Sequence, residues 1–230
     1  MANQKRTEAR AASQQKTRPW VWGVIAVIAV LAAVVVISVL TTGDDTKVSE
    51  GTVSTDGGSS SAAETQPVTV IGDPLPQFTG PPDAAVGTKA PVLQGFSFDG
   101  TPITIDAAAD NKPVMVVFLA HWCPHCNREM PRLTQWKESG AVPADLQVIG
   151  VATAADPNRD NYPPSSWFRN MGWPWPVLVD DVTQDAAVAY GLSGYPFFAI
   201  VGADGLVKVR VSGEVEIADI QKIVADALAG

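Results

Sequence analysis

The two cysteines of this chain, Cys123 and Cys126, are separated only by Pro124 and His125. A disulfide between them would close a very small loop, so it would constrain the unfolded chain only weakly. Stability is therefore a poor reason for the pair. A Cys-x-x-Cys pair can instead cycle between dithiol and disulfide, so the spacing indicates redox chemistry. The alternative, two buried cysteines packed as small apolar groups, does not account for the flanking Trp122.

The cysteines follow a predicted strand and open a predicted helix. Residues 114–119 are a continuous, Val-rich apolar run, which predicts a strand buried on both faces, and residues 127–137 have a helical pattern. Unpaired N–H groups and the positive end of the helix dipole favour a thiolate at this junction. We therefore expect Cys123 to be the exposed nucleophile. Cys126 would be the shielded resolving thiol that breaks the mixed disulfide with the substrate.

Two histidines flank the first cysteine. His125, as a cation or a ring donor, can stabilise a Cys123 thiolate, and a stabilised thiolate makes the disulfide a stronger oxidant. Replacing His125 should then lower the reduction potential. The alternative is a solvated histidine that caps the helix. For His121 we prefer an exposed residue at the end of the strand over a source of positive potential near Cys123.

The elements that position the pair follow from the rest of the pattern. Residues 96–98 and 103–105 alternate around Asp99-Gly100, which predicts a hairpin. Further along, the pattern predicts helices at residues 163–171, 183–190 and 216–228, and strands at residues 146–152, 176–180, 197–201 and 206–211. This alternation predicts an α/β domain with a central mixed sheet and helices on both faces.

The N-terminal 40 residues have the pattern of a membrane anchor. Residues 1–19 are a basic tail, in which five Lys and Arg residues oppose a single acidic one, Glu8. Residues 20–40 are apolar apart from Gly23 and Ser38, and as a helix they would span roughly 30 Å. This run is longer than the roughly 7–15 residues of a signal-peptide core. We expect an uncleaved transmembrane helix with a cytoplasmic N-terminus and an extracytoplasmic catalytic domain.

Composition divides the rest of the chain. Residues 41–86 are rich in Thr, Ser, Gly, Asp and Pro, which is typical of a flexible, disordered linker, and residues 87–230 have the composition of one globular domain. The whole chain carries −8 and the first 18 residues carry +4, so the remainder carries −12. This acidity argues against a nucleic-acid partner.

Between about residues 88 and 228 the chain resembles the thioredoxin superfamily, and more closely its membrane-anchored TlpA/ResA-like branch. A lone Cys-x-x-Cys is a weak signal, but a strand, Trp-Cys-x-x-Cys, a helix and a later Gly-x-Pro before a strand together are a strong one. The resemblance implies a thioredoxin-like fold and a thiol–disulfide oxidoreductase. It is carried by Ala90-Pro91, residues 120–126, Glu129, Pro131, Gly194-Tyr195-Pro196 and Asp204-Gly205.

The resemblance also implies roles for single residues. Pro196 matches the superfamily's cis-proline, which would leave the Tyr195 backbone free to pair with an extended substrate segment. The alternative is a trans proline that opens a strand. Together with Trp122 and Pro124, these residues form the expected substrate-binding surface. Glu129 matches an acidic residue linked to proton handling, and the alternative is an exposed first-turn carboxylate favoured by the helix dipole.

The direction of electron flow is less decided. Cys-Pro-His-Cys is also the active-site sequence of the DsbA oxidases, and Val117 stands where thioredoxins place a buried Asp. Phe197 replaces the polar residue that is common after the cis-proline in thioredoxins. His125 of this motif and the missing Asp slightly favour an oxidant that installs disulfides. Glu129 and the TlpA/ResA-like frame favour a reductant of apocytochrome or other envelope thiols.

Four other functions are alternatives to thiol–disulfide exchange. A zinc site is disfavoured because such sites draw their ligands from separated segments, whereas four candidates lie close together, at His121, Cys123, His125 and Cys126. A c-type haem would need a histidine where Asn127 stands. A peroxidase would have a different context around its cysteine. A redox-inactive tethered binding module is the non-enzyme alternative.

We therefore expect an enzyme that needs no metal or organic cofactor. Its partners would be protein thiols and disulfides outside the cytoplasm, the cell membrane through residues 20–40, and a membrane electron-transfer protein that recycles the cysteines. Residues 156–175 either shape the substrate surface or pack as core, and they carry Trp167, Trp173 and Trp175.

Overall fold

The apolar run before the cysteines forms the central strand β4 (Val114–Leu119), and all of its residues are buried. In the computed structural model, which describes residues 63–229, successive side chains of β4 enter two different cores. Val116 and Phe118 pack with one cluster, while Val117 and Leu119 pack with the other. This alternation is what a strand covered on both faces requires.

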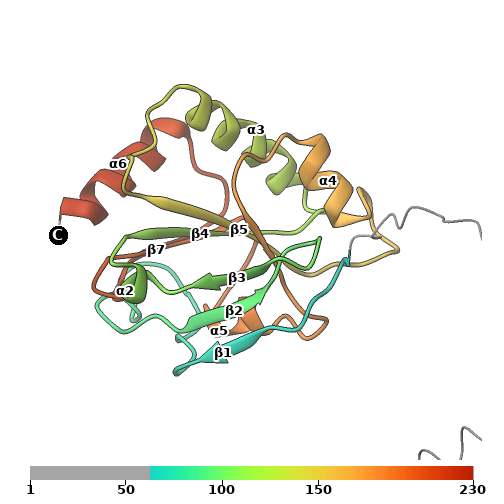
Figure 1. Ribbon diagram of the computed structural model, residues 1–230. Coiled ribbons are helices and arrows are strands. Elements are labelled where there is room, and N and C mark those ends of the chain that lie inside the picture. The colour runs from blue at the N-terminus through green and yellow to red at the C-terminus, as the bar shows by residue number, and fades with distance from the viewer. Residues whose placement is uncertain (1–62, 230) are drawn as a thin grey trace, which may run out of the picture. The chain divides into compact units, whose positions relative to one another are not determined.

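Strand β4 lies inside one mixed sheet of eight strands (Figure 1). The strand order is β1-β2-β6-β5-β4-β7-β8, and β3 pairs with β2. Strands β4, β5 and β6 are parallel, and the other pairs are antiparallel. The other strands are β1 (Thr69–Ile71), β2 (Val92–Phe96), β3 (Pro102–Ile105), β5 (Gln147–Ala152), β6 (Val177–Val179), β7 (Phe197–Val201) and β8 (Val207–Ser212).

Helices cover both faces of this sheet, as the sequence predicted (Figure 1). On one face lie α3 (Pro124–Glu138), α4 (Pro164–Asn170) and α6 (Ile217–Ala229), whose Met130, Phe168 and Ile220 join the same core cluster. The short helices α2 (Ala107–Asp110) and α5 (Asp185–Ala189) contribute to the opposite core, together with Tyr190.

The predicted hairpin is present, with β2 and β3 paired in antiparallel register from Phe96↔Pro102 to Leu93↔Ile105. The Asp99 side chain accepts hydrogen bonds from the Ser97 hydroxyl and, at 3.0 Å, from the Thr101 N–H. These bonds close the turn and end β2 at Phe96, two residues earlier than the alternation suggested.

The domain begins earlier than its composition predicted. Residues 63–86 were assigned to the flexible linker, but they lie against the sheet: β1 pairs with β2, and Leu75, which is buried, donates its N–H to the Ala189 carbonyl at 2.8 Å. The Asp83 carboxylate binds the guanidinium of buried Arg210 at 2.6 Å. The segment lacks periodicity because single apolar side chains, rather than one face of a helix or strand, fill the core.

Three predicted segments lie wholly outside the described residues: the basic tail (1–19), the transmembrane helix (20–40) and the first part of the linker (41–62). Across residues 63–229, the structure contains no helix with the length and apolarity needed to cross a membrane.

Candidate active site around Cys123 and Cys126

Cys123 lies at the junction between β4 and α3, as the sequence predicted. It is the N-cap residue of α3, with an extended backbone (φ −78°, ψ 120°), and the helix begins at Pro124. The Cys123 carbonyl accepts hydrogen bonds from the Asn127 N–H at 3.1 Å and from the Asn127 side chain at 3.0 Å. These two hydrogen bonds fix the first turn of α3 directly after the cysteine.

The Cys123 thiol is less accessible than expected. Cys123 is only 5% exposed, so the prediction of an exposed nucleophile is wrong for this structure. Its Sγ donates to the Tyr195 carbonyl at 3.6 Å, and Trp122 and Tyr195 pack beside it in the same apolar cluster. The chain segment before β7 therefore covers one side of the sulfur.

Cys126 is fully buried, as its predicted shielded position requires. Burial raises the pKa of the Cys126 thiol, because the surrounding side chains solvate a thiolate poorly, and the nearby charge of Glu129 raises it further. Cys126 therefore holds its proton at neutral pH. Any reaction in which it acts as a nucleophile needs a proton acceptor close by.

Glu129, three residues after Cys126 on the same helix, is the candidate for this acceptor, and it is 0% exposed. Its Oε2 accepts hydrogen bonds from the Val215 N–H at 3.1 Å and from Arg132 at 3.4 Å. Its Oε1 has no hydrogen-bond partner among residues 63–229. Burial raises the pKa of Glu129 to about 7, against the lowering effect of these two donors. The alternative of an exposed first-turn carboxylate is therefore wrong, and the group can exchange a proton near neutral pH.

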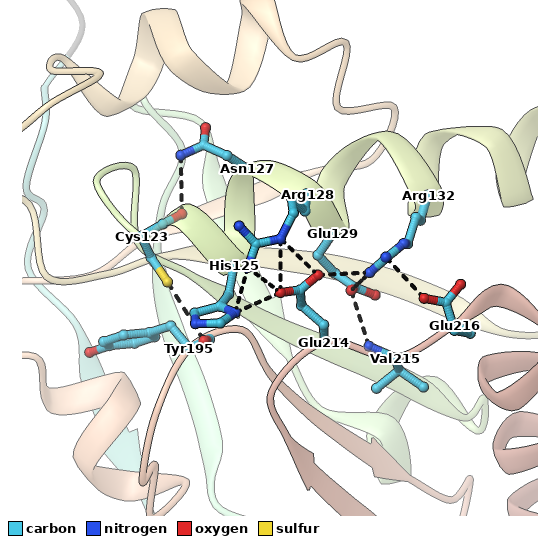
Figure 2. Close-up of polar contacts among 10 residues, drawn as sticks. All are labelled: Cys123, His125, Asn127, Arg128, Glu129, Arg132, Tyr195, Glu214, Val215 and Glu216. Atoms are coloured by element: carbon cyan, nitrogen blue, oxygen red, sulfur yellow. Dashed lines mark hydrogen bonds and ion pairs between the residues drawn. The ribbon is translucent and has the colours of Figure 1, made fainter.

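His125 has a different partner from the one that the sequence suggested. Its imidazole lies 2.6 Å (Nδ1 to Oε1) from the carboxylate of Glu214 and 2.8 Å from the guanidinium of Arg128 (Figure 2). Its side chain is 59% exposed. Nδ1 of His125 is therefore hydrogen-bonded to Glu214, and no hydrogen bond joins His125 to Cys123 among the described residues.

His121 is buried, not exposed as the preferred interpretation had it. Its Nδ1 donates to the Asp160 carbonyl at 2.7 Å, and its Nε2 accepts from the Asp156 N–H at 3.1 Å. Burial lowers the pKa of the His121 imidazole, so the ring stays neutral with one N–H, which fits this pattern of one donor and one acceptor. His121 therefore fastens the loop after β5, and it shares no ligand set with His125.

The expected substrate-binding residues surround the cysteines. The Tyr195–Pro196 bond is cis, which confirms that prediction. The Tyr195 and Trp122 rings lie edge to face, with centroids 5.9 Å apart, and the Trp122 indole donates to the Ala154 carbonyl at 2.8 Å. The Arg159 guanidinium lies 4.0 Å above the Trp122 ring. Pro124 is exposed beside Cys123.

The aromatic stretch before β6 mainly packs against the domain. Trp167 is buried, and its indole donates to the Asn127 side chain at 2.8 Å, which ties α4 to the first turn of α3. Trp173 and Trp175 lie edge to face, with centroids 5.0 Å apart. They line a shallow hollow with Phe98 and Phe168. The interpretation as core therefore holds for Trp167.

The sequence did not single out Glu214, Arg128 and Arg132, although all three lie beside the cysteine helix. Arg128 and Arg132 follow His125 at intervals of three and seven residues, which puts them on one helical face and could have indicated a cationic stripe. Glu214 follows β8, more than 80 residues from these partners. No local pattern marks it.

The chain is similar to a protein family and to several known proteins. The family model described as "AhpC/TSA family" matches residues 71–210. The chain is 27% identical over 150 residues to the thiol:disulfide interchange protein HelX of Rhodobacter capsulatus, covering 65% of this chain and 80% of HelX. It is 37% identical over 123 residues to the soluble secreted antigen MPT53 of Mycobacterium tuberculosis, covering 54% of this chain and 63% of that protein.

The fold has similar solved structures. A Chlorobium tepidum protein provisionally titled thiol:disulfide interchange protein DsbE superposes with a TM-score of 0.50 at 20% identity, covering 62% of this chain and 96% of that one. This likeness supports the thioredoxin-like arrangement of sheet and helices.

Proposed function

This chain belongs to the AhpC/TSA family, and we propose that, as a thioredoxin-like oxidoreductase, it exchanges disulfides with protein thiols through Cys123 and Cys126. One observation carries the proposal. A thiol at the N-cap of a 15-residue helix stands beside a second, buried thiol, and a buried carboxylate next to that thiol has an oxygen without a partner among the described residues. A scaffold for binding alone has no use for this combination.

The exchange proceeds in two steps. The Cys123 thiolate attacks one sulfur of a substrate disulfide, the substrate S–S bond breaks, and the first substrate thiolate leaves. Cys126 then loses its proton to the free Oε1 of Glu129 and attacks the Cys123 sulfur. The Cys123–Cys126 disulfide forms, the second substrate thiolate leaves, and two electrons have passed from the enzyme to the substrate. The reverse sequence installs a disulfide, with Glu129 returning the proton to Cys126.

Substrate recognition would use the surface around Tyr195. Trp122 and Pro124 flank Cys123 in the chain, the Trp122 and Tyr195 rings lie edge to face, and the Tyr195 carbonyl accepts the hydrogen bond from the sulfur. An extended substrate segment laid along Tyr195 and Pro196 would bring its own sulfur to Cys123. Binding through the backbone gives affinity with little dependence on sequence, which suits an enzyme that acts on several proteins.

We place the reductant direction first. The sequence-based preference for an oxidant rested on two features, Val117 in place of a buried Asp and His125 stabilising the Cys123 thiolate. In the structure His125 binds Glu214, which weakens the second of them. The oxidant direction is the second candidate, since Cys123 at a helix N-terminus still has the dipole in favour of its thiolate. The reduction potential decides between them: a value near or below about −270 mV means a reductant and a value near about −120 mV means an oxidant.

The proposed location follows from the sequence. Residues 20–40 would hold the domain outside the cytoplasmic membrane, and an integral membrane protein carrying a dithiol would return electrons to the oxidised pair. Membrane association that resists alkaline carbonate, and that is lost on removal of residues 1–40, would support the tether. Release of the full-length chain by carbonate would contradict it.

The function is tested with the full-length protein and with Cys123→Ser. Wild type should accelerate the reduction of insulin disulfides by dithiothreitol, and Cys123→Ser should return the rate to the uncatalysed level. Cys126→Ser should instead accumulate mixed disulfides, because its first step survives and its second does not. A Cys123→Ser protein that retains the wild-type rate would refute the proposal. Peroxide consumption without insulin reduction would place the chain among peroxidases.

A further inference from the structure

The loop after β8 presents one carboxylate to three cationic or ionisable side chains of the cysteine helix (Figure 2). The Glu214 oxygens lie 2.6 Å from Arg128, 2.9 Å from Arg132 and 2.6 Å from His125. All three partners lie within the first nine residues of α3, which begins next to Cys123. Glu214 is thus the common partner of all three side chains.

The contacts keep Glu214 ionised. Hydrogen bonds from Arg128 and His125 lower the pKa of Glu214 to about 2. Its side chain is 21% exposed, so the carboxylate is partly withdrawn from water and directed at its partners. A full negative charge therefore faces the first turns of α3 at every pH at which thiol exchange occurs.

The backbone on both sides fixes the position of Glu214. The Gly213 N–H donates to the Pro196 carbonyl at 2.8 Å, which links the loop to the residue after Tyr195. The Val215 N–H donates to buried Glu129 at 3.1 Å. Three consecutive residues therefore contact the Tyr195–Pro196 segment, His125 and the proposed proton acceptor, and Glu214 cannot shift without disturbing the other two contacts.

A negative charge at this point opposes a Cys123 thiolate. Cationic groups near a cysteine stabilise its thiolate, and this stabilises the reduced pair and makes the disulfide more oxidising. Arg128 lies five residues after Cys123, on the helix that Cys123 caps. By pairing with Arg128, Glu214 offsets the positive potential of the guanidinium, and it also holds the His125 imidazole in a hydrogen bond of its own.

We propose that Glu214 is a positioning residue that holds His125 and Arg128 and keeps the Cys123–Cys126 pair more reducing than its Cys-Pro-His-Cys sequence alone would make it. This inference deepens the proposed exchange function and rests on it. It explains how a motif shared with disulfide-forming enzymes can serve a reductant. The redox couple is unchanged, with two electrons and two protons per disulfide, and the Glu214 charge destabilises the thiolate of the reduced pair and so favours the disulfide.

The test is Glu214→Gln, which keeps the size of the side chain and removes its charge. Glu216→Gln is the matched control, because Glu216 lies two residues further on, is 69% exposed and, among the described residues, forms one ion pair, with Arg132 at 2.9 Å. Both full-length variants are equilibrated with reduced and oxidised glutathione, and the dithiol fraction is measured. We expect Glu214→Gln to shift the equilibrium about fivefold to tenfold toward the dithiol, where tenfold corresponds to about 30 mV. Glu216→Gln should shift it less than about twofold, as an exposed pair would.

Two further variants separate positioning from a general structural effect. Glu214→Asp keeps the charge with a shorter reach, so it should lie between wild type and Glu214→Gln. Adding His125→Ala to Glu214→Gln should reverse part of the gain, because the released imidazole is one of the groups that can then stabilise the Cys123 thiolate. A Glu214→Gln shift no larger than that of Glu216→Gln, or a shift toward the disulfide, would overturn the inference.

The outcome is distinct from the test of function, since glutathione equilibration needs no protein substrate. A normal insulin reduction rate with an unmoved potential in Glu214→Gln would refute the role of Glu214 and leave the exchange function standing. A shifted potential in a protein without insulin activity would support the role of Glu214 and refute the exchange function.

Discussion

Two charged clusters lie four residues apart along the chain, and they differ in almost every physical respect. The Arg210 side chain is 0% exposed, and its guanidinium binds Asp83, the Pro76 carbonyl and the Tyr190 carbonyl at 2.6–2.9 Å. Around Glu214, by contrast, the His125 and Arg128 side chains are 59% and 52% exposed. The first cluster is buried, and the second is about half exposed to solvent.

This difference separates stability from tuning. A buried charge must keep its partners, since an unpaired charge in the interior is strongly unfavourable. The Arg210 cluster therefore fixes residues 76–83 to the domain. Exposed pairs contribute little to stability. The Glu214 cluster can therefore change its charge without unfolding the protein, and its charge acts on the chemistry of the nearby thiols.

Removing the charge of Asp83 should have the largest effect. Asp83→Asn leaves buried Arg210 without its counter-ion, and we expect the free energy of unfolding to fall by about 3 kcal/mol. Urea titration followed by tryptophan fluorescence measures this loss. The reduction potential should stay at its wild-type value, because the pair lies away from the cysteines in the fold.

Asp73→Asn is the control for this prediction, since Asp73 is exposed in the same segment, and it should leave the urea midpoint in place. The double variant Asp83→Asn/Arg210→Met should recover part of the loss, because a buried pair can often be replaced by neutral groups. An Asp83→Asn protein as stable as Asp73→Asn would remove one side of the comparison.

The contrast also marks what sequence alone can predict. The strands around residues 114–119, 146–152 and 197–201 and the Cys123 junction were all predicted, since each rests on a local pattern of apolar residues or turns. Strand β1 and helix α2 were missed, because elements of three and four residues show no periodicity.

Both clusters depend on contacts that no local pattern records. Asp83 and Arg210 are 127 residues apart, and His125 and Glu214 are 89 apart. The sequence therefore placed Cys123, Cys126 and Pro196 on the right elements, but it gave no sign that His125 pairs with Glu214. The partner of a charged side chain is set by tertiary packing, whereas the position of a thiol on a strand–helix junction is set by its neighbours in the chain.

Glu129 lies between the two cases, buried like Arg210 but part of the reacting site. Its pKa is raised to about 7, so the native state binds a proton that the unfolded state releases near pH 4.5. The stability from this group is full below pH 4.5 and is lost as pH rises toward 7. We expect a loss of roughly 2–3 kcal/mol over that range, at about 1.4 kcal/mol per pKa unit.

Glu129→Gln should flatten this slope, because the amide does not titrate. Unfolding by urea at several pH values between 4 and 8 measures it for both proteins. Glu138→Gln, at the exposed end of the same helix, should keep the wild-type slope. A slope shared by wild type and Glu129→Gln would mean that Glu129 ionises as an ordinary surface carboxylate, and its proposed part in proton transfer would fail with it.

Salt should produce the smallest effect, and it tests the open character of the Glu214 cluster directly. The screening length falls from about 30 Å at 0.01 M to about 3 Å at 1 M salt, which weakens charges in water far more than buried ones. In wild type the charges around Glu214 nearly balance, so the glutathione equilibrium should change by less than about twofold between these two conditions. In Glu214→Gln the uncompensated cations should be screened, and at least half of the shift toward the dithiol should disappear at 1 M salt.

The same salt series on Asp83→Asn should leave its loss of stability almost unchanged, because solvent ions do not reach the Arg210 side chain. If salt restored Asp83→Asn as much as it restored Glu214→Gln, the two clusters would share one environment. The distinction between a dry cluster that holds the fold and a wet one that sets the thiol chemistry would then have no physical basis. Salt therefore tests burial itself, independently of which residue is replaced.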